Sequence, residues 1–300
     1  MRDSIVTIPP YAPFIEEVVA HPAVSGVRLN TVMPTHEPLE ELLTRLKSVT
    51  DQYGKELYID LKCRQLRVKS FGVPPFTEIE LTHNISVKTP VTAYFSDGTE
   101  AAKVMKVKGN RLIMLDGPQK VVGPGESLNI PDPSLEIKGF FTPTDLEYIA
   151  AGKKTGVKNY ILSFVEKKED IALMREQYAE ANIVAKIESR KGLEYVRKQY
   201  DGSVRLMAGR GDMYVELERP HQIITAMHDI VKADPKAIGA SRIFTSLKHS
   251  MEPSCADIGD VDSLWRMGYQ TLMFGDEICM KRNNIINALN LYGIMAKEYE

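Results

Sequence analysis

The chain has 300 residues, of which 43% are hydrophobic and 26% charged, and its formal net charge at pH 7 is −2. This composition is typical of a soluble globular protein, and the length suits one β/α barrel with or without a small inserted domain. Domains that bind nucleic acid usually carry a strongly basic face or a high isoelectric point. The nearly balanced charge therefore argues against a nucleic-acid partner.

The cysteines and the hydrophobic segments bear on the cellular compartment. Cys63, Cys255 and Cys279 are far apart and odd in number, which favours free thiols over a disulfide framework or a clustered zinc site. The longest apolar runs fall short of the roughly 18 residues that span a bilayer. The N-terminal residues lack the apolar core of a signal peptide. We therefore expect a cytoplasmic protein without a membrane partner.

The first third of the chain alternates short apolar runs with helical patterns. A β-branched run at 5–8 ends at two prolines and predicts a strand. Apolar residues at helical spacing within 14–19 predict a helix, and 26–30 predicts a second strand. Leucines at i, i+3, i+4 and i+7 within 39–46 predict an amphipathic helix, and 56–61 predicts a third strand.

Between about residues 68 and 132 the helical period disappears. Turn residues such as Ser96-Asp97-Gly98 separate short runs that are typical of strands. We expect a small all-β insertion over 68–132, and a barrel made from 1–67 and 133–300. The strands expected in the insertion are 78–81, 91–95, 103–107 and 111–115.

The alternation of strands and helices resumes at Thr142. This residue fits a helix N-cap, Pro143 fits the first helical position, and Asp145 fits the partner in a capping box. Five further strands follow, each with a helical pattern after it. They are 160–165, 183–187, 204–208, 237–241 and 270–274. Eight strand–helix units predict a TIM-type (β/α)8 barrel, in which the active site lies at the C-terminal ends of the strands.

Several of these strands end in polar or charged residues, which a barrel would bring to one mouth. Lys186-Ile-Glu188 and Gly211-Asp212 are the most informative, because each follows a buried apolar run. Glu188 and Asp212 are hard oxygen ligands suited to Mg²⁺ or Mn²⁺. The alternative is that some of these charges are solvated or form ion pairs. The other strand-end residues are Arg28, Asn30, Asp60, Ser163, Ser241, Asp276 and Glu277.

Two segments resemble motifs of pyruvate kinases. Ala185-Lys-Ile-Glu-Ser-Arg-Lys-Gly192 is similar to the motif A/S-K-I-E-N-x-E-G. The resemblance implies that Lys186 is catalytic and that Glu188 binds the essential divalent metal. Arg210-Gly-Asp212 resembles the start of A-R-G-D-L-G-V-E. It implies that Asp212 is the second metal ligand and that the amides of Gly211 and Asp212 hold the substrate carboxylate.

Weaker similarities extend the resemblance along the chain. Val27-Arg-Leu-Asn30 resembles A-R-x-N, which implies that Arg28 contacts a phosphoryl group and that Asn30 contacts potassium. Residues 59–67 resemble L-D-T-K-G-P-E-I-R, with Asp60 and Arg67 matching as cofactor-binding residues. The β insertion lies where the family carries its mobile lid, which with Arg67 would meet the nucleotide.

Two serines complete the residues that the resemblance assigns. Ser163-Phe-Val165 resembles S-F-V-R and implies substrate binding by Ser163. Ser241 lies where the family has a threonine beside the enolate carbon. We expect it to act in catalysis, by orienting the carboxylate or a water that protonates the enolate.

The chain also departs from the family pattern. Val32-Met33 replace Ser-His after the Asn30 segment, and Leu61 replaces a threonine, so we expect an altered potassium site. The insertion is short for the lid. The strand-eight motif M-L-S-G-E-T-A is here Met273-Phe-Gly-Asp-Glu-Ile-Cys279. We also expect no counterpart of the regulatory C-terminal domain after the eighth helix.

These observations predict a Mg²⁺- or Mn²⁺-dependent phosphotransferase resembling pyruvate kinase. Its substrate would be phosphoenolpyruvate, pyruvate or a close 2-oxo acid, handled through a metal-stabilised enolate, with ADP or ATP as nucleotide. One alternative is a metal-dependent lyase or aldolase that uses no nucleotide. Another is a non-catalytic descendant that binds a metabolite. The sequence leaves a homo-oligomer open.

Overall fold

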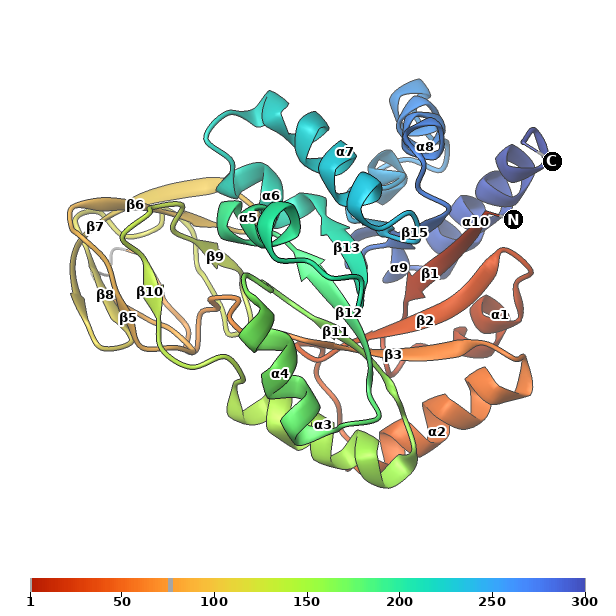
Figure 1. Cartoon of the computed structure of the whole chain (residues 1–300), viewed down its shortest axis with the longest axis horizontal. Coiled ribbons are helices and arrows are strands. Elements are labelled where there is room, and N and C mark those ends of the chain that lie inside the picture. Colours follow the sequence, from red (N-terminus) through yellow and green to blue (C-terminus); the bar gives the residue numbers. More distant parts are fainter. Residues whose placement is uncertain (1, 75–77, 300) are drawn as a thin grey trace.

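A closed barrel of parallel strands dominates the computed structural model, which describes residues 2–74 and 78–299 (Figure 1). The strand order around the barrel is β1-β15-β14-β13-β12-β11-β3-β2, and each neighbouring pair is parallel. This confirms the predicted α/β barrel. The strands are β1 (Asp3–Thr7), β2 (Val24–Asn30), β3 (Glu56–Leu61), β11 (Asn159–Leu162), β12 (Asn182–Ile187), β13 (Arg205–Gly209), β14 (Ile238–Ala240) and β15 (Thr271–Phe274).

Helices connect the strands and surround the barrel (Figure 1). Helix α3 begins with the predicted capping box, in which Thr142 accepts from the Asp145 amide and Asp145 accepts from the Thr142 amide. The helices are α1 (Ile15–Ala20), α2 (Leu39–Gln52), α3 (Pro143–Thr155), α4 (Lys168–Gln177), α5 (Arg190–Lys198), α6 (Arg210–Glu216), α7 (Ile223–Ala233), α8 (Cys255–Met267), α9 (Asp276–Cys279) and α10 (Arg282–Lys297). Within the described ranges, none of these is long and apolar enough to cross a membrane.

The core has two parts because alternate residues of each strand point to opposite faces. One set fills the barrel interior, and the other packs under the surrounding helices. The interior set is Ile5, Ile161, Val184, Met207, Ile238, Ala240 and Met273. This side-chain packing closes the barrel below its mouth, so a ligand can enter only at the strand ends.

The insertion lies between β3 and α3 and forms a separate β structure on the left of Figure 1. It contains a five-stranded antiparallel sheet of order β4-β8-β7-β6-β9 and a second pair, β10-β5. Its own apolar core includes Phe95, Val104, Leu112 and Val122. The strands are β4 (Glu78–Glu80), β5 (Ile85–Ser86), β6 (Val91–Phe95), β7 (Glu100–Lys108), β8 (Arg111–Met114), β9 (Leu128–Asn129) and β10 (Glu136–Ile137).

Three strands of the insertion have no counterpart in the sequence prediction. β5, β9 and β10 contain only two residues each, which is too short for a detectable alternating pattern. β10 lies beyond residue 132, where we expected the insertion to end, and it pairs with β5. The division of the chain into a barrel domain and an insertion domain at 68 and 132 stays a prediction.

Candidate active site

A cavity of about 230 Å³ lies at the C-terminal ends of the barrel strands, beneath the insertion. Residues from β2, β12, β15, α6, α9 and the segment after β14 line it on the barrel side, and Gln65, Arg67, Asp97 and Ser127 line it on the insertion side. The structure brings most of the predicted site residues together here. They are Arg28, Asn30, Arg67, Lys186, Glu188, Gly211, Asp212 and Ser241.

Lys186 and Glu188 enter the cavity from the same side of the β12 segment because they are two residues apart. The Lys186 ammonium lies 3.2 Å from Glu188 Oε1 and 3.7 Å from Asp60 Oδ1. The other Glu188 oxygen, Oε2, accepts a hydrogen bond of 3.0 Å from the Phe164 amide. Both charged side chains are almost fully buried. Lys186 therefore stands between two carboxylates and is shared by them.

The pKa of Glu188 reflects this shortage of positive charge. Burial, together with the nearby Asp212 carboxylate, raises the pKa of Glu188 to about 8 against the opposing effect of Lys186. Burial alone would lower the pKa of Lys186, but Asp60 and Glu188 raise it above its ordinary value. The site thus holds a protonated lysine beside a carboxylate that is costly to ionise. An added cation would relieve that cost.

Asp212 supplies the second carboxylate of the cavity and lies in the first turn of α6. Its Oδ2 accepts from Gln65 Nε2 at 2.9 Å, and its Oδ1 accepts from Asn129 Nδ2 at 3.1 Å. Both donors are neutral amides that belong to the insertion side, so they orient the carboxylate without cancelling its charge.

Gly209 makes room for this arrangement at the end of β13. A Cβ atom added there would lie 2.6 Å from Glu188 Cγ, closer than real Cβ contacts allow. At Gly211 the nearest atoms would be Asp97 Oδ2 at 3.6 Å and Ser241 Cβ at 3.8 Å, which are ordinary contacts. The lack of a side chain is therefore required at Gly209, where Glu188 crosses the strand end.

Asp97 is a cavity residue that the sequence analysis treated only as part of a turn. It lies between β6 and β7, and its Oδ1 accepts from the Ser127 hydroxyl at 3.2 Å. Burial, and then the charge of Asp212, raise the pKa of Asp97. The next residue, Gly98, approaches Val215 of α6, since an added Cβ would lie 3.1 Å from its side chain. The insertion is therefore closed over the barrel mouth.

The opposite side of the cavity is built around Arg28, which is buried. Arg28 Nε donates to Asp60 Oδ2 at 2.7 Å, and Nη1 donates to Asp276 Oδ1 at 2.7 Å and to the Thr7 hydroxyl at 2.9 Å. Asn30 Nδ2 donates to Asp276 Oδ2 at 2.7 Å. Burial would lower the pKa of Arg28, but Asp60 and Asp276 raise it well above its ordinary value.

Asp60 and Ser163 lie behind the cavity wall. Asp60 is fully buried and also accepts from Lys62 Nζ at 3.0 Å, while the Ser163 hydroxyl donates to Asp60 Oδ1 at 3.4 Å. Burial would raise the pKa of Asp60, but Arg28, Lys186 and Lys62 hold it far below its usual range. Asp60 holds the side chains of Arg28 and Lys186, and Ser163 binds Asp60. Direct contact of either residue with substrate or cofactor stays a prediction.

Arg67 and Ser241 complete the predicted set. Arg67 Nε donates to Gln65 Oε1 at 3.1 Å, and its guanidinium also binds the Gly125 carbonyl in the insertion. Ser241 follows β14 with a left-handed backbone, φ 71°, and its carbonyl accepts from Arg210 Nη2 at 2.7 Å. Arg210 is fixed in turn by Asp260 at 2.7 Å. This framework holds Ser241 against the cavity, opposite the insertion.

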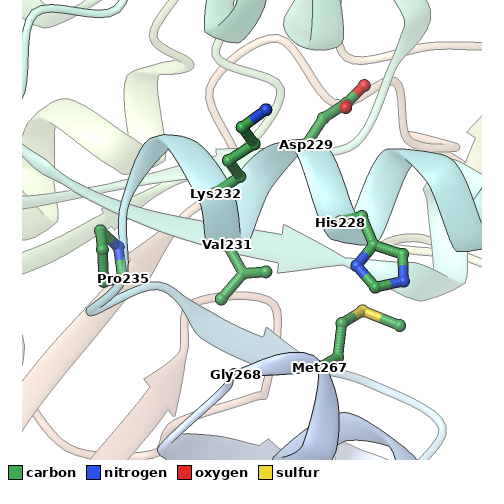
Figure 2. Close-up of a pocket in the computed structure, with 7 residues that line it drawn as sticks. All are labelled: His228, Asp229, Val231, Lys232, Pro235, Met267 and Gly268. Carbon is green, nitrogen blue, oxygen red and sulfur yellow. The ribbon is translucent and has the colours of Figure 1, made fainter.

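A second pocket lies at the other end of the barrel. Figure 2 shows this cavity of about 430 Å³ between the ends of α7 and α8, where His228 lies beside Met267. The loops at Pro235 and Gly268 lead into the N-terminal ends of β14 and β15, the face that contributes to stability in β/α barrels. Asp229 in this pocket is bound by Arg197 Nε at 2.8 Å. Among the residues that the structure describes, Asp229 is the one carboxylate in the lining of this pocket, whereas several carboxylates line the mouth.

The ligand count at the mouth limits how a metal could bind. Over residues 2–74 and 78–299, no three His, Cys, Asp or Glu side chains form a group that could hold a metal ion by themselves. Glu188 and Asp212 could supply two oxygen ligands. Mg²⁺ commonly takes one or two carboxylates and completes its shell with water and substrate oxygens. The pair fits such a partly open site.

Comparison with known proteins agrees with the fold. The family model "Pyruvate kinase, barrel domain" matches residues 77–280, which is more than half of the chain. Pyruvate kinase of Thermoplasma acidophilum is 25% identical over 92% of this chain and 54% of its own length. That of Methanocaldococcus jannaschii is 24% identical over 92% and 65%, and that of Bacillus licheniformis is 22% identical over 99% and 57%.

The chain spans about half to two thirds of the length of these curated relatives. The match nevertheless covers the part of the chain that supplies Lys186, Glu188 and Asp212. The closed eight-stranded barrel, the insertion after its third strand and the family match lead to one conclusion: this protein belongs to the pyruvate kinase family.

Proposed function

We propose that this protein is a divalent-metal-dependent enzyme that acts on phosphoenolpyruvate, pyruvate or a close 2-oxo acid, with phosphoryl transfer as its reaction. One observation carries the proposal. The carboxylates of Glu188 and Asp212 and the ammonium of Lys186 face one buried cavity at the barrel mouth. The family membership supports the same chemistry, since the matched relatives are pyruvate kinases.

The electrostatics of the cavity fit a divalent cation. Glu188, Asp212 and Asp97 bring three carboxylates to the cavity, and Lys186 is already shared between Glu188 and Asp60. Mg²⁺ or Mn²⁺ held by Glu188 and Asp212 would balance this charge. When bound, the metal would supply Lewis-acid stabilisation of negative charge on a substrate oxygen.

The chain's own residues would provide the rest of the site. Lys186 is fixed by two carboxylates and presents a preorganised positive charge, which is effective because its side chain is almost fully buried. The amides of Gly211 and Asp212 would orient the substrate carboxylate. The Ser241 side chain lies close to Gly211, where it could orient the carboxylate or a proton-donating water.

The insertion would bind the nucleotide and exclude water. Arg67 lines the cavity from the insertion side, and its contacts with Gln65 and Gly125 tie it to that part of the chain. Gln65 and Asn129 connect the insertion to Asp212 through hydrogen bonds. Closing the lid would therefore also place the metal-binding carboxylate. A potassium ion at Asn30 would meet an altered site, because Asp276 already binds the Asn30 amide.

A coupled assay tests this proposal. Pyruvate should appear from phosphoenolpyruvate only when both ADP and Mg²⁺ are present, and chelation of the metal should stop it. Asp229→Ala is a matched control, because that carboxylate lies in the pocket at the opposite end of the barrel. Pyruvate formation that is independent of Mg²⁺ would contradict the proposed role of the metal.

A lyase or aldolase that needs no nucleotide is the second candidate. The observation that favours it is the Asp276 carboxylate, which binds both Arg28 and Asn30 on the side where the phosphoryl group would lie. Turnover of a longer 2-oxo acid with Mg²⁺ but without ADP would support this candidate. Tight metabolite binding without turnover of either substrate type would instead support a non-catalytic descendant.

A further inference from the structure

We propose that Asp276 is a specificity-determining residue, whose carboxylate competes with a ligand phosphoryl group for Arg28 and Asn30. The inference rests on the proposed function in one respect, namely that the ligand enters the cavity at the barrel mouth. It adds a ligand preference: Asp276 would weaken the binding of a phosphorylated ligand, compared with a site that lacks this carboxylate, while leaving ligands that carry only carboxylate and enolate oxygens unaffected.

The first step of the argument is the way Asp276 is bound. Each of its oxygens accepts one hydrogen bond of 2.7 Å, Oδ1 from Arg28 and Oδ2 from Asn30. Two oxygens of a phosphoryl group would make the same pair of contacts, because carboxylate and phosphate are recognised by the same fork of donors. Asp276 therefore already occupies the donors that an incoming phosphoryl group would need.

The second step concerns which partner is fixed. The Arg28 side chain is 7% exposed and is held from behind by Asp60 and Thr7, whereas the Asp276 side chain is 42% exposed. Asp276 begins the four-residue helix α9 at the rim of the cavity. A ligand that displaces one of the two would displace Asp276, since Arg28 is anchored within the barrel.

The third step is the charge balance around Arg28. Its single positive charge is already flanked by two carboxylates, Asp60 and Asp276. A dianionic phosphoryl group added to this arrangement would meet like charge unless Asp276 moved away or lost its charge. A ligand bound only by the metal carboxylates and Lys186 would avoid this competition. The pyruvate kinase motif quoted above has glycine at this place, which has no side chain to compete.

Calorimetric titration with inorganic phosphate tests the competition directly, without requiring metal or turnover. We expect Asp276→Gly to bind phosphate at least about 10-fold more tightly than wild type, which corresponds to about 1.4 kcal/mol. Asp276→Asn should give a smaller gain, because a neutral amide can still occupy the donors. Glu277→Gln is the matched control, since it removes one negative charge from the next residue, which lines the same cavity. It should change phosphate affinity by less than about 3-fold.

Oxalate with Mg²⁺, a mimic of the enolate form of pyruvate, separates competition from a general charge effect. Its affinity should change by less than about 3-fold in Asp276→Gly. Equal gains for phosphate and oxalate, or no gain for phosphate in either Asp276 variant, would overturn the inference. Thermal unfolding confirms that each variant is folded. If wild type failed to bind Mg²⁺ with oxalate, the proposed function would fail, but the phosphate titration would still decide the role of Asp276.

Discussion

The two sides of the cavity differ in how their charges are paired. On the β12 and α6 side, Glu188 and Asp212 are oriented by amide donors, and Glu188 shares Lys186 with Asp60. On the β2 and α9 side, Arg28 is bound by both Asp60 and Asp276. The first side is short of positive charge, while the second is satisfied within the protein.

The two sides of the cavity are therefore suited to different ligands. A carboxylate pair that lacks a counter-charge is stabilised by a cation, so the β12 side is suited to metal binding. An arginine that is already paired must lose a partner before it binds an anion. We call the β12 and α6 side the metal side and the β2 and α9 side the phosphoryl side, after the ligands proposed for them, and we expect the metal side to bind its ligand more readily.

The largest expected effect is on the metal side, at Lys186. Lys186→Met should lower turnover at least about 100-fold while the fold stays intact, because it removes the preorganised positive charge. Steady-state kinetics on the substrate identified by the coupled assay, with circular dichroism, measure this. Lys198→Met is the control, because that exposed lysine pairs with Glu194 on α5, at 3.0 Å, away from the barrel mouth. Full activity of Lys186→Met would remove the catalytic role from this lysine.

Gly209 tests whether the geometry of the metal side matters as well as its charge. In Gly209→Ala the new Cβ would lie 2.6 Å from Glu188 Cγ, so the carboxylate must move. We expect a loss of about 1–3 kcal/mol in the free energy of unfolding and weaker Mg²⁺ binding. Gly211→Ala, whose new contacts are 3.6 Å or longer, should cost less than about 1 kcal/mol. Equal losses of stability in the two variants would contradict this account of Gly209.

Glu216 shares the Asn129 amide with Asp212, and it should make the free energy of unfolding depend on pH. Burial raises the pKa of Glu216 to about 7, although its Oε1 accepts from Asn129 Nδ2 at 3.0 Å. The folded protein therefore keeps a proton that the unfolded chain loses above its ordinary pKa of about 4.5. The stabilising effect is complete below that pKa and is lost as the pH rises through 7.

Between pH 5 and pH 7 this group should lower the free energy of unfolding by about 2 kcal/mol. Glu216→Gln should remove that part of the pH dependence, because glutamine does not titrate. Urea unfolding of wild type and variant at several pH values measures the difference. Parallel pH profiles for the two proteins would show that Glu216 does not hold its proton in the folded state.

The smallest expected effect is at Ser163, behind the phosphoryl side. Its hydroxyl donates only a long hydrogen bond, 3.4 Å, to Asp60, which Arg28 and Lys62 already bind. Ser163→Ala should therefore cost about 1 kcal/mol of stability and change turnover by less than about 10-fold. A loss of turnover comparable to that of Lys186→Met would instead place the hydroxyl in contact with the substrate.

Much of the fold follows from local patterns in the sequence. Apolar runs that end in charge predicted the end of β12 beside Lys186 and the end of β13 shortly before Asp212, and the Thr142 capping box predicted the start of α3. These features depend on neighbouring residues, so a single sequence reveals them. The two-residue strands of the insertion escaped prediction because they exist only through their pairing partners.

The candidate site was predictable only where its residues end barrel strands. Asp97 and Asn129 reach the mouth because the insertion closes over α6, and Asn129 lies 83 residues from its partner Asp212. Asp276 was visible as a strand-end residue, but its binding to Arg28 joins positions 248 residues apart. Such contacts depend on tertiary packing, which has no local signal in the chain.

Calorimetry with Mg²⁺ and oxalate tests the central claim, that Glu188 and Asp212 form the metal side of one ligand site. Wild type should bind oxalate only when Mg²⁺ is present, and Asp212→Ala should bind it at least about 100-fold more weakly, because one of two carboxylate ligands is gone. Asp229→Ala should match wild type. Unchanged oxalate binding in Asp212→Ala, or binding that does not need Mg²⁺, would contradict the account.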